Sequence, residues 1–305
     1  MLMGTRAGVT VYGLDEARGQ ALADEVFAEW TRLDRAYSWY DPASELSRVN
    51  ATAPLGPVTV SAEFGGLIAR ALEVHRVTAG GFDATFSPLW ELWGRCAKAG
   101  RLPEPEELRA ARSRAGSESV RLSPSRLSVR FFRPVSLNLG GLVKDYALRR
   151  GGELLSRRAP GVPVLLDLGG DLLAHGRKDP AWQVGVRHPL RPGGLLGTLS
   201  FPEGGVVLTS GDYERFVEIG GRRYGHILDA RTGLPVSGFA GLTVYLPDAS
   251  VEHLPSAALV LLGREAALSR VRAIPGALAV WVGSDGSVRT AEGPACRAAW
   301  LAEAS

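Results

Sequence analysis

The sequence predicts an α+β fold, and two observations support that class. Stretches rich in β-branched and aromatic residues alternate with amphipathic stretches of helical period, without the regular strand–helix–strand repeat of a doubly wound parallel sheet. Hydrophobic residues make up 45% of the 305 residues, which is enough to bury a sizeable core. We therefore expect one compact domain over residues 1–305, with mixed or antiparallel sheets and flanking helices.

The amino-terminal part alternates strands with capped helices. A strand is expected at residues 9–12, followed by an amphipathic helix over 15–33 that starts at an aspartate with a glutamate close behind. A second capped helix is expected over 61–75, and a strand pattern returns at 119–131. Residues 101–118, rich in Pro, Glu, Arg and Ala, are expected to form a helical surface excursion. Phe82, Trp90 and Trp93 have the character of core residues.

The stretch LNLGGLVKDYALRRGGELL at residues 137–155 is predicted to be a strand, a tight glycine turn and a helix. Asn138, Gly140 and Gly141 stand where the strand would end. A turn of this kind presents backbone groups at a helix start, where an anion or a metal–phosphate unit can bind, and Lys144 would add a positive charge. The alternative is a strand-to-helix junction with glycines for close packing and a solvated lysine. Neither GxGxxG nor GxxxxGK[ST] is present, so neither a dinucleotide fold nor a P-loop is supported.

The carboxyl-terminal part is rich in strands, followed by helices and a hairpin. Strands are expected at residues 162–174, 182–186, 195–201, 205–208, 216–219 and 241–246. Helices are expected over 251–262 and around 265–271, and a hairpin over 277–289 that turns at Ser-Asp-Gly. Asp83 and Thr85 are polar residues among apolar ones, so they need either buried partners or a ligand.

Net charge, cysteine spacing and hydropathy bear on three questions: nucleic-acid binding, disulfide or metal sites, and membrane spans. The formal net charge is only +3, from 35 basic and 32 acidic residues without a basic block, so nucleic-acid binding is not indicated. Cys96 and Cys296 lack metal-type spacing and are expected to be two separate thiols, although a disulfide between them stays open. No apolar stretch reaches the roughly 18 residues that span a bilayer. We expect a soluble protein, cytoplasmic if Met1 is the native start and on the cell-envelope or periplasmic side if a leader was removed.

Seven motifs occur in order along the chain. They are MGT at 3–5, SWYDPASELSRVN at 38–50, GGFDATFSPLWELWG at 80–94, NLGGLVKDYAL at 138–148, LLDLGGDLLAHG at 165–176, TSGDYERF at 209–216 and HILDARTGLPV at 226–236. Together they resemble the ApbE-type flavin transferases (FAD:protein FMN transferases). The resemblance implies an α+β enzyme that binds FAD, uses Mg²⁺ and attaches FMN through a phosphoester to a Thr or Ser, with release of AMP. It also implies an acceptor flavoprotein, either a subunit of a membrane redox complex or a secreted protein.

The same resemblance assigns roles to individual residues. The positions that match the family's FAD contacts are Met3, Tyr40, Gly81, Phe82, Asp83, Asn138, Lys144 and Ile227. Among them, Lys144 is the cationic partner expected for the pyrophosphate, and Tyr40 could stack on a ring. His226 lies in the H-I-x-D segment associated with activity, where a neutral imidazole could take the proton of the acceptor hydroxyl. The alternative for His226 is a structural histidine, and Asp229 and Arg231 are expected to hold the turn that follows.

The resemblance also implies a metal site, formed by the Gly141 carbonyl and by an Asp and a Thr of a later helix. Where the family reads Asp-Ala-Leu-x-Thr-Ala, this chain reads EHLPSA at 252–257. A gap-free alignment places His253 and Ala257 on the ligand positions, which would spoil a Mg²⁺ site. One inserted residue places Glu252 and Ser256 there, and we prefer this alignment because it keeps a carboxylate and a hydroxyl at i and i+4 of one helix. The alternative is an exposed glutamate with a helix-start serine.

Three further departures concern the central stretch. Asn138 and Arg149 replace aspartates of the family pattern, and Asp145 replaces a glycine. An asparagine still hydrogen-bonds a flavin edge but carries no charge. Two competing functions therefore remain: a binding module that keeps FAD but has lost turnover, and an FAD pyrophosphatase that releases FMN and AMP to water.

Overall fold

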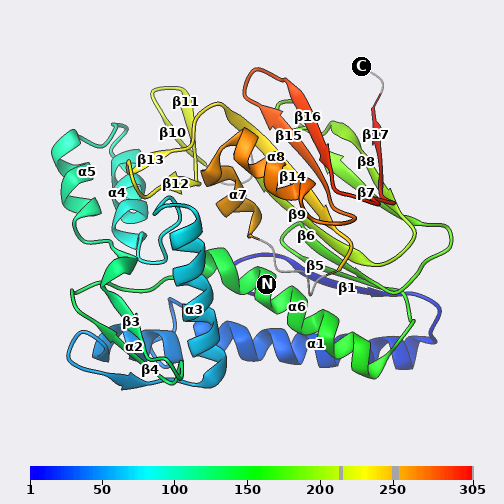
Figure 1. Cartoon of the computed structure of the whole chain (residues 1–305), viewed down its shortest axis with the longest axis horizontal. Coiled ribbons are helices and arrows are strands. Elements are labelled where there is room, and N and C mark those ends of the chain that lie inside the picture. The colour runs from blue at the N-terminus through cyan, green and yellow to red at the C-terminus, as the bar shows by residue number, and fades with distance from the viewer. Residues whose placement is uncertain (213–215, 249–253, 304–305) are drawn as a thin grey trace. The chain divides into compact units, whose positions relative to one another are not determined.

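The computed structural model describes residues 1–212, 216–248 and 254–303, and it has the predicted α+β architecture (Figure 1). Two units can be distinguished. The first comprises Met1–Leu33, Lys144–Tyr213 and Gly238–Ser305, and the second comprises Asp34–Val143 and Glu214–Ser237. The single domain over residues 1–305 stays a prediction, and the units are described in turn.

A seven-stranded sheet forms the centre of the first unit, and every neighbouring pair in it is antiparallel. Its order is β1 (Ala7–Val11), β5 (Val164–Leu168), β6 (Asp171–His175), β9 (Gly205–Gly211), β14 (Phe239–Leu246), β15 (Leu278–Gly283) and β16 (Val288–Glu292). The predicted strand over 162–174 is the β5–β6 hairpin, and the predicted hairpin over 277–289 is β15–β16. The other strand predictions for this unit are confirmed as well.

Helices cover one face of this sheet: α1 (Glu16–Tyr37), α6 (Gly140–Arg158), α7 (Ser256–Leu262) and α8 (Arg264–Arg272) (Figure 1). Glycines let α6 approach the sheet closely. A Cβ atom at Gly151 would lie 2.7 Å from Leu166 Cδ1, and one at Gly152 would lie 2.8 Å from Leu173 Cδ1. The fully buried Trp30 of α1 donates its indole N–H to the Ala147 carbonyl at 2.9 Å, which ties the two long helices together.

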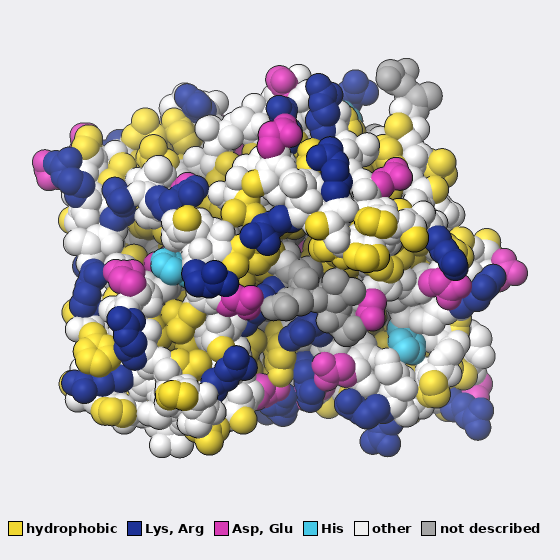
Figure 2. All heavy atoms as spheres, in the orientation of Figure 1, with side chains coloured by type: hydrophobic (Ala, Val, Ile, Leu, Met, Phe, Trp, Pro, Cys, Tyr) yellow, Lys and Arg dark blue, Asp and Glu magenta, His cyan; other side chains and the backbone are white. Residues whose placement is uncertain are grey.

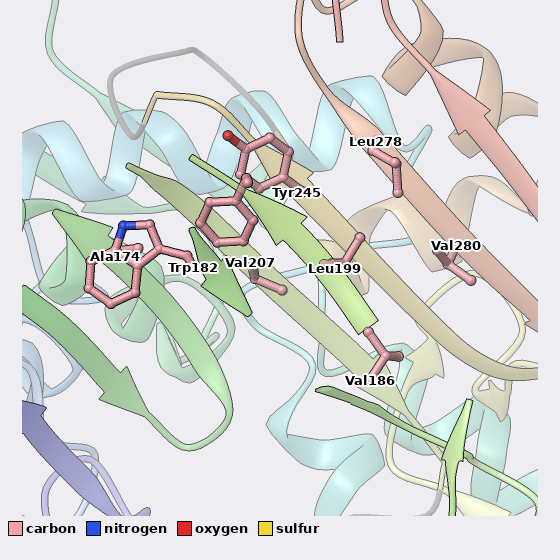
Figure 3. Packing of buried hydrophobic residues seen from close by; sticks show 9 residues of the cluster. Ala174, Trp182, Val186, Leu199, Val207, Tyr245, Leu278 and Val280 are labelled. Carbon is pink, nitrogen blue, oxygen red and sulfur yellow. The ribbon is translucent and has the colours of Figure 1, made fainter. Parts of the chain in front are cut away.

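A second sheet packs on the opposite face, in the order β17 (Ala299–Ala302), β8 (Leu195–Phe201) and β7 (Trp182–Arg187). The core between the two sheets is shown in Figure 3 and consists of Ala174, Trp182, Val186, Leu199, Phe201, Val207, Tyr245, Leu278 and Val280. Side chains alternate along each strand, so Ala174 joins this core while its neighbour Leu173 faces α6. One face of the seven-stranded sheet therefore packs against the second sheet, and the other packs against α6.

The second unit is mainly helical, with α2 (Glu45–Thr52), α3 (Ala62–Val77), α4 (Ser87–Lys98) and α5 (Pro105–Arg112). Its short strands are β2 (Val58–Thr59), β3 (Val120–Leu122) and β4 (Ser128–Phe131), the β10–β11 hairpin (Phe216–Ile219 and Arg222–Gly225), and the pair β12 (Leu228–Asp229) and β13 (Leu234–Pro235). The predicted helix after residue 61 is confirmed, with Ser61 Oγ accepting from Phe64 N. The α5 helix is exposed over most of its length, and only Ala111 of α5 is fully buried.

The core of the second unit contains Leu89, Leu92, Trp93, Cys96, Ala111, Ile219 and Leu228. The first four follow the i, i+3, i+4, i+7 spacing of one α4 face. Trp90 falls outside this stripe and is 40% exposed, so its prediction as a core residue is wrong. The prediction for Trp93 is confirmed, and its indole N–H donates to the Gly233 carbonyl at 2.8 Å.

Two boundary predictions are wrong, one because of a long-range side-chain contact and one because of a proline. Residues 137–139 form no strand, because the Asn50 side chain takes both backbone groups of Leu137, donating to its carbonyl at 2.9 Å and accepting from its N–H at 2.8 Å. Gly140 and Gly141 belong to the first turn of α6 instead of a turn before it. The helix expected from residue 251 begins at Ser256, after an extended Pro255.

Both cysteines are free thiols, as expected. Within the described ranges, none of the helices combines the length and the apolarity that a membrane crossing requires. On the face shown in Figure 2, Lys and Arg side chains lie dispersed among acidic and apolar ones.

We expect Gly151→Ala to destabilise the protein by about 1–3 kcal/mol, because the added methyl group overpacks the buried contact with Leu166. Urea unfolding of both the variant and the wild type measures this. Gly19→Ala in α1 is the control, since its Cβ would make an ordinary 3.7 Å contact with Val11. That change should stabilise by up to about 1 kcal/mol through helix propensity. Equal stability of the two variants would contradict the close approach of α6.

Candidate functional site

Asp83 of the second unit is a buried carboxylate that accepts four hydrogen bonds. One carboxylate oxygen accepts from Thr85 N at 2.7 Å, Thr85 Oγ1 at 2.6 Å and Ser117 Oγ at 2.6 Å, and the other accepts from Ser117 N at 3.0 Å. Thr85 Oγ1 in turn accepts from Gly116 N at 2.6 Å. We call Asp83, Thr85, Gly116 and Ser117 the Asp83 cluster. Asp83 and Thr85 were expected to need buried partners or a ligand, and the cluster provides the buried partners. It also anchors the chain that follows α5.

The Gly80–Gly81–Phe82 turn before this cluster is fixed by the end of α3. Phe82 donates its backbone N–H to Thr78 Oγ1 at 3.0 Å, and the Phe82 carbonyl accepts from His75 Nδ1 at 2.9 Å. The Gly81 carbonyl accepts from Ala230 N at 3.0 Å. The backbone of both residues is thus held by other segments. His75 thereby orients a residue that matches a family FAD contact.

The start of α6 meets the Phe82 ring. A Cβ atom at Gly141 would lie 3.2 Å from Phe82 Cε2, so glycine is what lets the ring approach here. Asn138 accepts from Gly140 N at 3.0 Å through Oδ1 and donates to Ser87 Oγ at 3.3 Å, and its own N–H donates to the Ala84 carbonyl at 2.6 Å. Phe82, Asn138 and Gly141, all predicted as site residues, are therefore neighbours in the second unit.

In the first unit, a polar edge lies on the helical face of the sheet where β6 begins. Because the β6–β9 pairing ends at Leu172 and Val207, Thr209 N has no strand partner on that side, and the Asp171 carboxylate accepts from it at 3.0 Å. Lys144 Nζ of α6 lies 3.4 Å from the other Asp171 oxygen. Burial raises the pKa of Asp171 despite the opposing effect of the Lys144 ammonium. Asp171 was not singled out from the sequence, although its motif LLDLGGDLL contained it.

The same edge continues along β9. Ser210 Oγ lies 2.9 Å from Ser256 Oγ, and both residues are buried. Ser256, a predicted metal ligand, is the first residue of α7, and the preceding Leu254 and Pro255 are not helical. Glu252 and His253 lie outside the described residues. We call Lys144, Asp171, Ser210 and Ser256 the polar edge.

The remaining predicted residues occupy varied environments. Met3 adopts a positive φ of 50° in the amino-terminal turn, and the Tyr40 side chain is 91% exposed. Ile227 is buried and its carbonyl accepts from Val236 N at 2.9 Å, while His226 is half-buried. Asp229 accepts from the Arg231 guanidinium at 2.6 Å, which raises the pKa of Arg231. The Asp229 carbonyl accepts from Gly233 N at 2.7 Å, so the prediction that Asp229 and Arg231 hold this turn is confirmed.

The two groups of side chains differ in what they offer a ligand. The Asp83 carboxylate is 7% exposed and committed to protein donors, so Asp83 fixes the neighbouring backbone. Lys144 is different, because its side chain is 33% exposed and one of its three N–H donors is directed at Asp171. The remaining donors of Lys144 suit an anionic group such as a phosphate.

We expect Asp83→Asn to lower the free energy of unfolding by about 1–3 kcal/mol, because an amide NH₂ would replace an acceptor that faces N–H and O–H donors. Urea unfolding of the variant and the wild type, followed by tryptophan fluorescence, measures this. Asp24→Asn, an exposed change on α1 whose side chain is bonded to Gln20 Nε2, should stay within about 0.5 kcal/mol of wild type. A tolerated Asp83→Asn would show that the cluster is not needed for stability.

Comparison with known proteins adds independent information. The model of the ApbE family matches residues 3–282. An FAD:protein FMN transferase of Treponema pallidum is 28% identical, covering 96% of this chain and 86% of the relative, and one of Klebsiella pneumoniae is 31% identical, covering 77% and 72%. The crystal structure of the ApbE protein of Thermotoga maritima superposes with a TM-score of 0.83 at 28% identity, covering 96% of this chain and 95% of that one. The Pseudomonas stutzeri flavinyl transferase ApbE gives 0.74 at 26% identity, covering 95% and 92%. The chain therefore belongs to the ApbE family.

Proposed function

We propose that this protein transfers FMN from FAD to a Thr or Ser hydroxyl of an acceptor flavoprotein, forming a phosphoester and releasing AMP. The observation that carries the proposal is Lys144, a partly exposed ammonium beside Asp171 in the family's NLGGLVKDYAL motif. Relatives named FAD:protein FMN transferase, aligned over most of their length, support it. An acceptor that is a redox-complex subunit or a secreted flavoprotein is the expectation carried over from the resemblance.

The proposed FAD contacts are the eight positions named from the resemblance: Met3, Tyr40, Gly81, Phe82, Asp83, Asn138, Lys144 and Ile227. Their structural settings suggest different contributions. Gly81 and Phe82 have backbones held by Ala230 and by α3, so they would bind without further ordering. Asp83 would act through this backbone, because its carboxylate is already occupied. Tyr40 is exposed enough for its ring to stack on a ligand.

Mg²⁺ is proposed as the cofactor, with Gly141, Glu252 and Ser256 as ligands. The donor set fits a hard cation, because it consists of a carbonyl, a carboxylate and a hydroxyl oxygen. The Ser256 hydroxyl already lies within hydrogen-bond distance of Ser210 Oγ, which would hold its orientation. When bound, Mg²⁺ would neutralise charge on the pyrophosphate. The residues of the chain position FAD and the acceptor hydroxyl, and His226 is the resemblance-based candidate for taking the proton.

Transfer is tested by incubating the protein with FAD, Mg²⁺ and a panel of Thr- or Ser-containing flavoprotein acceptors, followed by intact-mass analysis. We expect one acceptor to gain one FMN, with one AMP released per FMN attached. Replacing the target Thr by Val in that acceptor should abolish the gain. Free FMN and AMP with every acceptor unmodified would favour FAD hydrolysis, and FAD bound without cleavage would favour a binding module.

Lys144→Ala should weaken FAD binding by roughly 1.5–3 kcal/mol, the range for hydrogen bonds to charged groups. Calorimetric titration with FAD and with FMN measures this, and the wild type should prefer FAD. Arg157→Ala, near the carboxyl-terminal end of α6, is the control and should leave the affinity unchanged. Equal affinity of the Lys144 variant and the wild type would show that Lys144 does not contact the pyrophosphate.

The two alignments at residues 252–257 predict opposite sensitivities. If Glu252 is a ligand, Glu252→Gln should remove most Mg²⁺-dependent activity, because a neutral amide is a poorer ligand for a hard dication, and His253→Ala should cost little. If the gap-free alignment holds, His253→Ala is the damaging change and Zn²⁺ is preferred over Mg²⁺. Rates of FMN release across both ions decide between them.

A further inference from the structure

The carboxyl-terminal end of α3 carries two side chains that bond the backbone of Phe82. Thr78 Oγ1 accepts from Phe82 N at 3.0 Å, and the same hydroxyl donates to the Val74 carbonyl at 2.8 Å. The Phe82 carbonyl accepts from His75 Nδ1 at 2.9 Å. Both backbone polar groups of Phe82 are therefore held by side chains from one helix end. We call His75 and Thr78 the Phe82 clamp.

The partners of the His75 ring determine which of its nitrogens carries the hydrogen. A carbonyl oxygen only accepts, so the hydrogen that bonds the Phe82 carbonyl is on Nδ1. Asp83 Oδ2 lies 3.5 Å from the same nitrogen, so this N–H faces two acceptors of the turn. The His75 carbonyl also accepts from Gly80 N at 2.9 Å. His75 is thus joined to the turn through both its ring and its backbone.

Capping of α3 alone does not explain this arrangement. A histidine in the last turn of a helix can bond the last carbonyls of that helix, and His75 lies in the last turn of α3. Its N–H is instead directed at Phe82, seven residues further along the chain. Between them, Ala79 has a positive φ of 49°, a conformation that costs a non-glycine residue free energy. Backbone strain of this kind persists where surrounding contacts over-determine the chain, and it is concentrated at ligand sites.

The position of the Phe82 backbone decides where its ring lies. A Cβ atom at Gly141 would lie 3.2 Å from Phe82 Cε2, so the ring rests directly on the first turn of α6. On the other side, the Gly81 carbonyl accepts from Ala230 N at 3.0 Å. Gly81 and Phe82 are proposed FAD contacts, and Gly141 is a proposed metal ligand. A shift of the Phe82 backbone would therefore disturb three proposed contacts at once.

We propose that His75 and Thr78 are positioning residues for FAD, which rests on the proposed function. They hold the backbone of Phe82, and with it the Phe82 ring and the adjoining Gly81, in the conformation that binds FAD. Neither side chain has to touch the ligand. Because the turn is fixed in the free protein, binding requires little further ordering of its backbone. Loss of either hydrogen bond to Phe82 should therefore weaken FAD binding.

Two matched pairs of variants of the full-length protein test the clamp by calorimetric titration with FAD. The amide of asparagine places an N–H donor near the position of a histidine Nδ1, whereas the longer glutamine places it near Nε2. His75→Asn should therefore keep the bond to Phe82, and His75→Gln should lose it. In the same way, Thr78→Ser keeps the hydroxyl and Thr78→Val removes it.

We expect His75→Gln and Thr78→Val to raise the Kd for FAD by about 5- to 10-fold, the equivalent of one hydrogen bond. His75→Asn and Thr78→Ser should stay within about 2-fold of the wild type. In the free protein, Thr78→Val should also speed hydrogen exchange at the Phe82 N–H, because that group loses its acceptor. Bound FAD should restore part of the protection.

His175→Asn is the control for a merely structural role. His175 is half-buried in the first unit, and its Nε2 lies 3.3 Å from the Ala159 carbonyl, so the change removes a histidine–carbonyl contact of the same kind. Its Kd for FAD should equal that of the wild type even if its Tm falls. If His75 were merely structural, His75→Gln would behave in the same way, with a lower Tm and an unchanged Kd.

Two results would overturn the proposal. The first is a wild-type Kd for FAD in both His75→Gln and Thr78→Val, and the second is an equal loss of affinity in His75→Asn and His75→Gln. FMN release with Mg²⁺ and a Thr-containing acceptor is measured in parallel on the wild type. A wild type that binds FAD but releases no FMN and modifies no acceptor contradicts the proposed function, while the affinities still decide the role of the clamp. A wild type that does not bind FAD contradicts both.

Discussion

The carboxylate of Asp83 accepts four hydrogen bonds, and the loops of the second unit depend on that arrangement. It joins the chain after α5 to the segment before α4, and the adjoining Gly80–Phe82 turn is held by Thr78 and His75. A carboxylate so fully bonded can be buried at little cost, because each lost contact with water is replaced. The backbone around it is thereby held in one conformation before any ligand arrives, which reduces the entropy that binding must otherwise overcome.

Asp212 differs from Asp83 in the donors that the described residues offer to its carboxylate. Asp83 and Asp171 have donors from the protein, whereas the described part of the chain offers none to Asp212. The first two stabilise loops and strand ends. Burial raises the pKa of the third to about 6.

Much of the fold could be predicted from periodicity and capping residues. Strands and helices in which apolar residues recur at a regular spacing were predicted correctly, because each buries one face and that face must be apolar. The errors arose where a distant side chain or a single residue outside the periodic pattern decided the outcome. Residues 137–139 have the composition of a strand, yet the Asn50 side chain occupies the backbone of Leu137. Pro255 delays the start of α7, and Trp90 lies beside the buried stripe of α4 rather than on it.

The site was predictable only in part, since a motif reveals which residues matter but not what holds them. Phe82, Asn138 and Gly141 were named and do lie together, whereas the roles of His75 and Asp171 required the three-dimensional contacts. Residue-resolved hydrogen exchange, in the free protein and with FAD, tests the preorganisation most directly. The account predicts slow exchange at Thr85 and Ser117 N–H in both states and added protection at Gly81 and Phe82 with FAD. Exchange at Thr85 and Ser117 as fast as in exposed loops would contradict it.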